Sequence, residues 1–389
     1  MQYSRTITEM IPGGDDGWNV FRKSRRMITD GTDVTELTIG EHDIRTDPVI
    51  LDAMHRAALA GHTGYTTFDG EPELKEIVAE RITARTGVVT TPANVLIVPG
   101  GQGGLFATHH LTCDPGDGAL FIDPYYTTYP GTIRTVGAIP VAVTARAGNG
   151  FQPDAADIAA VAGGARSLLI NSPNNPTGVV YTRRTMDGIA QVCRDHDLWL
   201  ISDEVYDTQV WDGDHFSPRA LPGMAGRTLV IGSMSKSHAM TGSRVGWVIG
   251  PAEAIEHMAN LATHTTYGIS GFTQHAAAFA LGLGETFEEQ IAAPFRRRRD
   301  LVMRLMEGQN AIRAIPADGA MYVMLDIRRT GLSGEAFADG LLETQKVAVM
   351  PGESFGSAAA GHLRVALTVA DDRLEDAMRK LLAFADRQG

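Results

Sequence analysis

The amino-acid sequence predicts an α/β fold in which a mostly parallel central sheet is sandwiched by helices, with a smaller α+β domain attached. Between about residues 94 and 250, short apolar runs alternate with longer helical patterns. The runs show no polar alternation, as expected of strands that are buried on both faces. After about residue 286 the rhythm changes to a long charged helix followed by separate strands and helices. A chain of 389 residues is too long for one small core, so two domains are expected.

The expected elements follow in chain order. The strands of the large sheet are NVLIV (94–98), ALFID (119–123), IPVAV (139–143), SLLIN (167–171), LWLIS (198–202), TLVIG (228–232) and GWVIG (246–250). A helix over 70–87 ends at Gly87, a residue type that suits a helix C-terminus. A crossover helix over 181–197 carries Met186, Ile189 and Cys193 at helical spacing. Beyond it we expect a helix over 285–308, strands over 320–327 and 362–368 with a polar helix between them, and a closing helix over 371–387.

Composition and charge narrow the class of partner. The formal net charge of −12 argues against binding to nucleic acid or to an anionic membrane, and no apolar run approaches the ~18 residues of a membrane span.

The basic run FRRRRD (295–300) is interpreted as a solvated helix segment, because consecutive residues point to different sides of a helix. The only cysteines are Cys113 and Cys193, which fits a reducing compartment, so we expect a cytoplasmic protein. The histidines show no metal-ligand spacing, and no metal is expected.

Five of the expected strands end in clusters that can hydrogen bond, stack or carry charge. The clusters are PGGQGG (99–104), DPYYTTYP (123–130), NSPNNPTG (171–178), SDEVYDT (202–208) and SMSKS (233–237). Ligands of open parallel sheets bind outside the carboxyl ends of the strands, so the five clusters predict one shared site.

The glycine-rich cluster suits an anion. Gly100, Gly101, Gly103 and Gly104 lie between a strand and a helix, where backbone N–H groups and the helix N-terminus can receive a phosphate. The same residues also suit a tight strand-to-helix turn. Ser233, Ser235 and Arg244 supply the hydroxyls and the guanidinium that commonly bind phosphate and so favour the first interpretation.

Lys236 and Asp203 predict the chemistry. Lys236 follows a buried strand amid small residues, where its amine can form a Schiff base with an aldehyde cofactor. Asp203 ends another strand, and its carboxylate can keep a pyridine nitrogen protonated, as pyridoxal 5'-phosphate (PLP) requires. A lone aspartate is more often a helix cap or part of an ion pair, but the neighbouring lysine favours the cofactor role.

With these residues in place, the chain resembles the class I and II aminotransferases of PLP fold type I, of the aspartate aminotransferase kind. The resemblance rests on SPNNPTG (172–178), SDEVY (202–206) and SMSKSHAMTGSRVGW (233–247), and it extends from LTIGEHD (37–43) to HLRVALT (362–368). It implies a homodimer with shared active sites. We accordingly expect a large PLP-binding domain at 46–285 and a small domain formed by both termini, 1–45 and 286–389.

The resemblance also implies a role for each matching residue. Lys236 would hold PLP as the internal aldimine and carry a proton, and Asp203 would pair with the pyridine nitrogen. Tyr206 and Asn175 would hydrogen bond the phenolic oxygen of the cofactor. Residues implied around its ring and phosphate are Tyr126 (with Tyr125 as the alternative), Gly100, Gly101, Gln102, Ser233, Ser235, Arg244 and, from the partner subunit, Tyr65. Arg364 would bind the substrate α-carboxylate, and Gly40 and Asn175 would also contact the substrate. Because Arg364 lies in an apolar strand, an anion that pairs with it is expected.

The implied reaction is ping-pong transfer of an amino group from an L-amino acid to a 2-oxo acid such as 2-oxoglutarate. Related enzymes that prefer dicarboxylates often use a second arginine, and the corresponding THTTYGIS (263–270) has none; His264, Tyr267, Trp18 and Phe21 are alternative lining residues. Aspartate or an aromatic amino acid is the expected donor. Three alternatives stay open: a PLP-dependent lyase of the same fold, performing β-elimination or decarboxylation; a nicotinamide-dependent dehydrogenase using PGGQGG with Asp123; and a regulator without catalysis.

Overall fold

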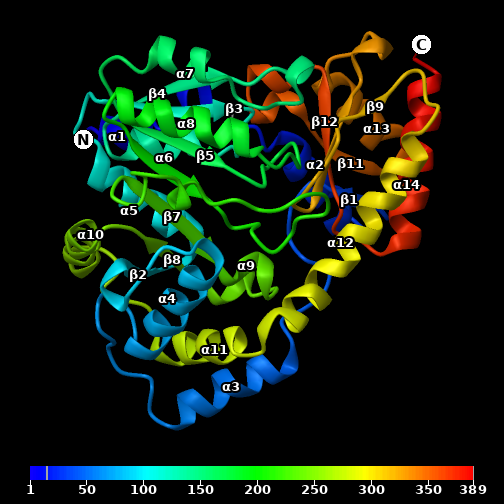
Figure 1. The fold of residues 1–389 in the computed structure, drawn as a ribbon. Coiled ribbons are helices and arrows are strands. Elements are labelled where there is room, and N and C mark those ends of the chain that lie inside the picture. The colour runs from blue at the N-terminus through cyan, green and yellow to red at the C-terminus, as the bar shows by residue number, and fades with distance from the viewer. Residues whose placement is uncertain (15, 389) are drawn as a thin grey trace.

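The computed structural model describes residues 1–14 and 16–388, and the described chain forms a seven-stranded and a five-stranded sheet (Figure 1). The large sheet has the order β2-β8-β7-β6-β5-β3-β4. Its strands are β2 (Val95–Val98), β3 (Gly118–Asp123), β4 (Ile139–Thr144), β5 (Ala165–Asn171), β6 (Trp199–Asp203), β7 (Thr228–Ser233) and β8 (Gly246–Ile249). β8 alone runs in the opposite direction to the other six strands, so the predicted mostly parallel sheet and its seven apolar runs are confirmed.

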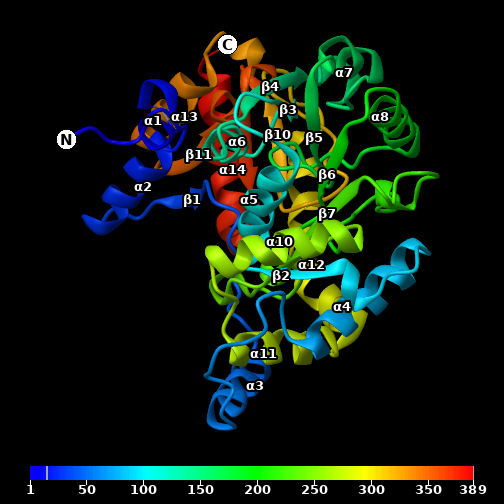
Figure 2. The ribbon, with the colours of Figure 1, turned by 90° about the vertical axis from the view of Figure 1, so that its left-hand side faces the viewer.

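Helices cover both faces of this sheet (Figure 2). One face packs against α5 (Gly100–Thr112), α6 (Tyr129–Thr135) and α10 (Ala252–His264). The other packs against α7 (Ala155–Val161) and α8 (Arg183–Asp195), and further along against α4 (Pro72–Thr86) and α11 (Gly271–Leu281), with α3 (Pro48–Leu59) outside α11. Leu96 and Val98 of β2 face the first layer and Val95 and Ile97 the second, which is why the strand is apolar at every position.

The small sheet has the order β1-β11-β12-β10-β9 and combines both ends of the chain. Its strands are β1 (Thr35–Leu37), β9 (Arg313–Ala314), β10 (Tyr322–Asp326), β11 (Val347–Pro351) and β12 (His362–Ala366). β1 pairs in parallel with β11, and the other pairs are antiparallel. The helices α12 (Gly284–Met306), α13 (Gly334–Gln345) and α14 (Asp371–Asp386) pack with this sheet around one apolar core. The domain boundaries expected near residues 45 and 285 stay a prediction.

The basic run on α12 differs from the prediction of a solvated segment. Arg298 is 5% exposed, and its guanidinium forms two hydrogen bonds with the carboxylate of Asp43, at 2.9 and 2.7 Å, and one with Asp371 at 2.9 Å. A buried guanidinium needs such partners, because an unpaired charge would be costly to bury. Arg298 therefore ties α12 both to the segment after β1 and to the start of α14.

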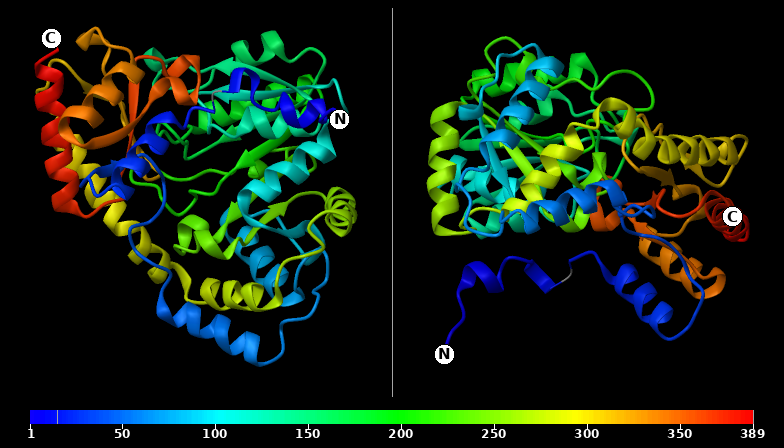
Figure 3. Two further views of the ribbon diagram at one scale, coloured as in Figure 1. Left: turned by 180° about the vertical axis from the view of Figure 1, so that it is seen from behind. Right: turned by 90° about the horizontal axis from the view of Figure 1, so that it is seen from below.

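The N-terminal segment contains α1 (Arg5–Thr8) and α2 (Asn19–Thr29) and runs along one side of the molecule (Figure 3). Along this path α1 lies near α6, and α2 packs beside β11 and α13 of the small sheet. Within residues 1–14 and 16–388, no helix has both the length and the apolar character needed to cross a bilayer.

Candidate active site

The carboxyl ends of the parallel strands line a cavity of about 370 Å³. It contains twelve of the site residues predicted from the sequence: Gly40, Gly101, Gln102, Tyr126, Asn175, Asp203, Tyr206, Ser233, Ser235, Lys236, Arg244 and Arg364. Gly100, Gly103, Gly104 and Tyr65 do not line it; of the alternative lining residues Trp18 does, whereas His264, Tyr267 and Phe21 do not. The cavity also includes residues that the sequence analysis did not single out, chiefly Tyr129 and Tyr322.

Lys236 lies on α9 (Met234–Ser237), a four-residue helix that directly follows β7. Ser233 caps the N-terminus of this helix: its hydroxyl accepts a hydrogen bond from the backbone N–H of Ser235 at 3.1 Å. The Lys236 ammonium donates to the carbonyl of Gly40. Burial lowers the pKa of Lys236 to about 8; the Glu41 carboxylate acts against this shift, and the cations Arg364 and Arg244 act with it. A useful fraction of this amine is therefore neutral, and nucleophilic, near neutral pH.

Asp203 is a buried carboxylate at the end of β6. Burial raises its pKa to about 6, although two hydrogen bonds act in the opposite direction. The Tyr129 hydroxyl donates to Oδ2 at 2.7 Å, and the Val205 N–H donates to Oδ1 at 3.3 Å. The sequence analysis did not predict Tyr129 as a site residue. The available signal was its position three residues after Tyr126, at the start of α6, where both rings face the same site. Of the two adjacent tyrosines, Tyr126 lines the cavity, while the ring of Tyr125 packs on Phe121.

Arg364 is 1% exposed and lies between the rings of Tyr322 and Phe355, 4.5 and 4.3 Å from their centroids. The partner anion expected from the sequence is not found among the described residues. The guanidinium donates instead to neutral oxygens, at 2.8 Å to Oδ1 of Asn175 and to the carbonyl of Thr38, and its Nε has no partner. Burial lowers the pKa of Arg364. The cation is thus available for an incoming carboxylate.

Tyr322 joins several of these groups. Its hydroxyl lies 3.0 Å from that of Tyr206 and 3.5 Å from Nδ2 of Asn175. A Cβ on Gly40 would lie 1.7 Å from the same hydroxyl, so only glycine fits there. The sequence carried one signal for this residue, an aromatic side chain in the strand that pairs with the strand of Arg364.

Several residues of the predicted phosphate site gather near the N-terminus of α5, and their role stays a prediction. Gly100 has a φ of +73°, and a Cβ there would lie 2.4 Å from Nη2 of Arg244. Arg244 is held by hydrogen bonds to the carbonyls of Thr241 at 2.9 Å and Pro99 at 3.3 Å. Ser233 and Ser235, whose hydroxyls bond each other at 2.9 Å, line the same cavity as Arg244, so two hydroxyls and a guanidinium are available there beside the start of α5. The Gln102 side chain points elsewhere and bonds Thr128 and Thr132 at 3.0 and 2.7 Å.

Tyr65 lies outside the cavity of its own chain. Its side chain is 88% exposed and its ring contacts that of Tyr267 at a centroid distance of 5.1 Å. Its predicted role toward a partner's phosphate site therefore stays a prediction.

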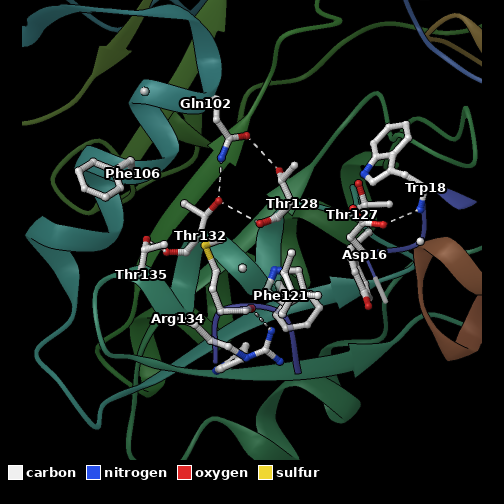
Figure 4. A pocket seen from close by; sticks show the side chains of 18 of the residues that line it. Asp16, Trp18, Gln102, Phe106, Phe121, Thr127, Thr128, Thr132, Arg134 and Thr135 are labelled. Carbon is white, nitrogen blue, oxygen red and sulfur yellow. Dashed lines mark hydrogen bonds between the residues drawn. The ribbon is translucent and has the colours of Figure 1, made fainter. Parts of the chain in front are cut away.

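A second cavity of about 1420 Å³ adjoins the first, and Trp18, Gln102 and Arg244 line both. In Figure 4, Gln102 reaches toward Thr128 and Thr132, while Asp16 and Trp18 approach from the N-terminal segment. Acidic lining residues outnumber basic ones: Asp16, Asp123, Glu335, Asp339 and Glu353 against Arg134 and Arg244. The active-site cavity thus shares lining residues with a larger space in which acidic side chains outnumber basic ones.

This fold and site define a PLP-type aminotransferase architecture, and comparison with known proteins identifies the family. Residues 32–381 match the family "Aminotransferase class I and II". The chain is 40% identical to an arginine–pyruvate transaminase of Pseudomonas aeruginosa, over 99% of this chain and 98% of that protein. It is 35% identical to an aspartate/prephenate aminotransferase of Thermus thermophilus, over 99% of both.

Solved structures agree with this assignment. The aspartate aminotransferase from Thermus thermophilus with maleate superposes with a TM-score of 0.92 at 32% identity, covering 99% of this chain and 100% of that one. An aromatic aminotransferase from Pyrococcus horikoshii gives 0.88 at 31% identity, covering 94% and 99%. The chain belongs to the class I and II aminotransferases and has the fold of the aspartate aminotransferases, as the sequence motifs predicted.

Proposed function

We propose that the chain uses PLP, held at Lys236, to move an amino group from an L-amino acid to a 2-oxo acid. The observation that carries this proposal is one cavity that contains an amine with a lowered pKa, a buried carboxylate and a buried guanidinium without a carboxylate partner. The cradle at Gly100 and Arg244 fits a phosphate, and the free donor capacity of Arg364 fits a substrate carboxylate.

When bound, PLP supplies the aldehyde that takes up the amino group and a pyridine ring that withdraws electrons. The carboxylate of Asp203, oriented by Tyr129, would hold the proton of the pyridine nitrogen. Tyr206 and Asn175 would donate hydrogen bonds to the phenolic oxygen. Arg364 would bind the α-carboxylate, and the amine of Lys236 would take a proton from the α-carbon and deliver it to the cofactor side. The reaction has two halves, so ping-pong kinetics follow.

For the donor, we propose an aromatic amino acid or aspartate, as the sequence suggested. The aromatic class has support in the lining of the site, where Trp18 and Tyr126 present ring surfaces. Apart from Arg364 and the phosphate-side Arg244, no arginine of the described chain lines the active-site cavity, which weakens the case for aspartate.

A second donor class, amino acids with long cationic side chains, is favoured by a different observation. The adjoining cavity is large, its acidic lining residues outnumber its basic ones, and one relative is named an arginine–pyruvate transaminase. Such a side chain would extend past Trp18 and Gln102 toward the carboxylates.

We also propose a homodimer. Tyr65, Tyr267 and Leu59 are exposed by 88, 48 and 76%, and Tyr65 packs on Tyr267, an arrangement that suits a covered surface better than a solvated one. Tyr65 would then reach the phosphate site of the partner. Light scattering of the purified protein measures the mass directly, and a monomer at micromolar concentration would refute the dimer. Cytoplasmic location stays a prediction; in the structure, Cys113 and Cys193 are free and buried.

The test of function is a donor screen. Purified protein with PLP would be given aspartate, phenylalanine or arginine, each with 2-oxoglutarate and then with pyruvate, and the amino acid formed from each acceptor would be measured. An amino acid formed from the acceptor supports aminotransfer. Release of ammonia or carbon dioxide without it would identify a lyase instead. The donor with the highest kcat/KM decides between the side-chain classes.

A further inference from the structure

The segment between β1 and α3, residues 38–46, contacts the small sheet and the catalytic helix α9. Toward the small sheet, the Thr38 carbonyl accepts from Arg364 of β12. Toward α9 and the loop after it, the Gly40 carbonyl accepts from the amine of Lys236, and the Thr46 hydroxyl donates to the carbonyl of Ala239 at 2.7 Å. The segment therefore lies directly against the residue that carries the chemistry.

His42 makes the central contact of this segment. The residue is 6% exposed, its ring packs edge-on against Phe295 at a centroid distance of 5.1 Å, and Nε2 lies 3.0 Å from the main-chain carbonyl of Lys236. A carbonyl oxygen can only accept, so Nε2 carries the hydrogen. Burial lowers the pKa of His42 to about 3, with Lys236 and Arg298 acting in the same direction and Asp43 against it. The imidazole is thus a neutral donor.

The Lys236 carbonyl requires a donor because α9 is only four residues long. The last carbonyls of a helix have no partner within it, and a short helix cannot satisfy them by continuing. Besides His42, the Gln209 side chain donates to the same oxygen, at a longer 3.4 Å. Two side chains from distant parts of the sequence therefore hold the backbone of the reactive lysine.

We propose that His42 is a positioning residue for the aminotransferase reaction: its Nε2–H holds the main chain of Lys236 so that the amine points into the cavity that also contains Asp203. The inference depends on the proposed function, since it assigns His42 to the chemistry of Lys236. A neutral imidazole suits the task because a lysine or arginine donor would place another cation beside the Lys236 amine, which already has Arg364 and Arg244 nearby.

The experiment compares three variants of the full-length protein. His42→Gln keeps an amide N–H at nearly the reach of Nε2, His42→Asn places the amide too short to reach the carbonyl, and His42→Phe keeps the ring on Phe295 without a donor. We expect the Asn and Phe variants to lose roughly 3- to 10-fold in kcat, the loss of about one hydrogen bond, while KM for the amino acid changes less than about twofold. The Gln variant should recover most of the wild-type kcat.

A second measurement does not depend on turnover. The rate at which the apoprotein captures PLP, followed by visible absorbance, should fall for Asn and Phe and recover for Gln, while thermal unfolding of the apoproteins shows whether each is folded. Equal rates for Asn and Gln would overturn the inference, whether both are normal or both are slow. If the Phe variant does not fold, the Asn and Gln pair still decides. Failure of the proposed function is distinct, because the wild-type protein itself would then transfer no amino group.

Discussion

Replacing Asp203 with asparagine should stabilise the protein without cofactor, by an amount that depends on pH. Burial raises the pKa of Asp203 from 3.8 to about 6 in the folded chain. A carboxyl group with a raised folded pKa contributes stability below the unfolded value and loses it as pH rises through the folded value. The difference of about two units corresponds to about 3 kcal/mol of destabilisation once the pH is above both values. Asparagine has nearly the same shape and carries no charge to bury. Its Oδ1 can accept from Tyr129, and its Nδ2 then faces the Val205 N–H, a cost that does not change with pH.

Urea unfolding of the two apoproteins at equal protein concentration, repeated from about pH 5 to about pH 7.5, measures this effect. Other titrating groups are common to both proteins, so the difference in unfolding free energy isolates Asp203. The advantage of the Asn variant in unfolding free energy should grow by roughly 1 kcal/mol across that range, because part of the total has already developed at the lower pH. A difference that stays constant with pH would refute the reasoning. The same variant should lose transamination, since an amide cannot hold the pyridine proton.

Three further changes test other parts of the site. Lys236→Ala should abolish transamination and leave the apoprotein folded by circular dichroism; near-normal turnover in a single reaction cycle would contradict the assignment. Arg364→Lys should raise the half-saturation concentration of every amino acid and 2-oxo acid by roughly 10- to 100-fold, because one ammonium cannot form the two parallel hydrogen bonds that a guanidinium makes with a carboxylate. An unchanged value for all substrates would show that another residue binds the α-carboxylate. Gly100→Ala should weaken PLP binding at least about tenfold, because residue 100 has a positive φ and the added Cβ would clash with Arg244. The matched control is Gly116→Ala, where φ is also positive but no atom lies near the added Cβ. Equal PLP affinities of the two variants would show that Gly100 does not form part of a phosphate site.

The sequence predicted the large sheet well because buried parallel strands are apolar at every position, and each run ended where the structure ends its strand to within about one or two residues. The sequence also predicted the cavity, because the polar clusters that follow parallel strands all lie at the carboxyl edge of the sheet. β1 was not predicted, since three residues with a central glutamate carry no pattern and form a strand only by pairing with β11, more than three hundred residues away.

The remaining differences arise from contacts between distant segments. Nothing local to Arg298 shows that Asp43 and Asp371 will surround it. Tyr129 gained its role only when α6 placed its hydroxyl beside Asp203. The expected anion at Arg364 followed from a sound rule about buried charge, but the chain meets that need with two aromatic faces and neutral oxygens.

That arrangement at Arg364 has a consequence for what the enzyme can accept. The buried Arg364 guanidinium has no carboxylate partner of its own, so in the proposed role the α-carboxylate of an entering amino acid would supply one. Simple amines bring no such group, so they enter without this compensation however well the rest of the molecule fits. If Arg364 binds the α-carboxylate as proposed, the pocket would distinguish amino acids from amines before the substrate side chain makes any contact.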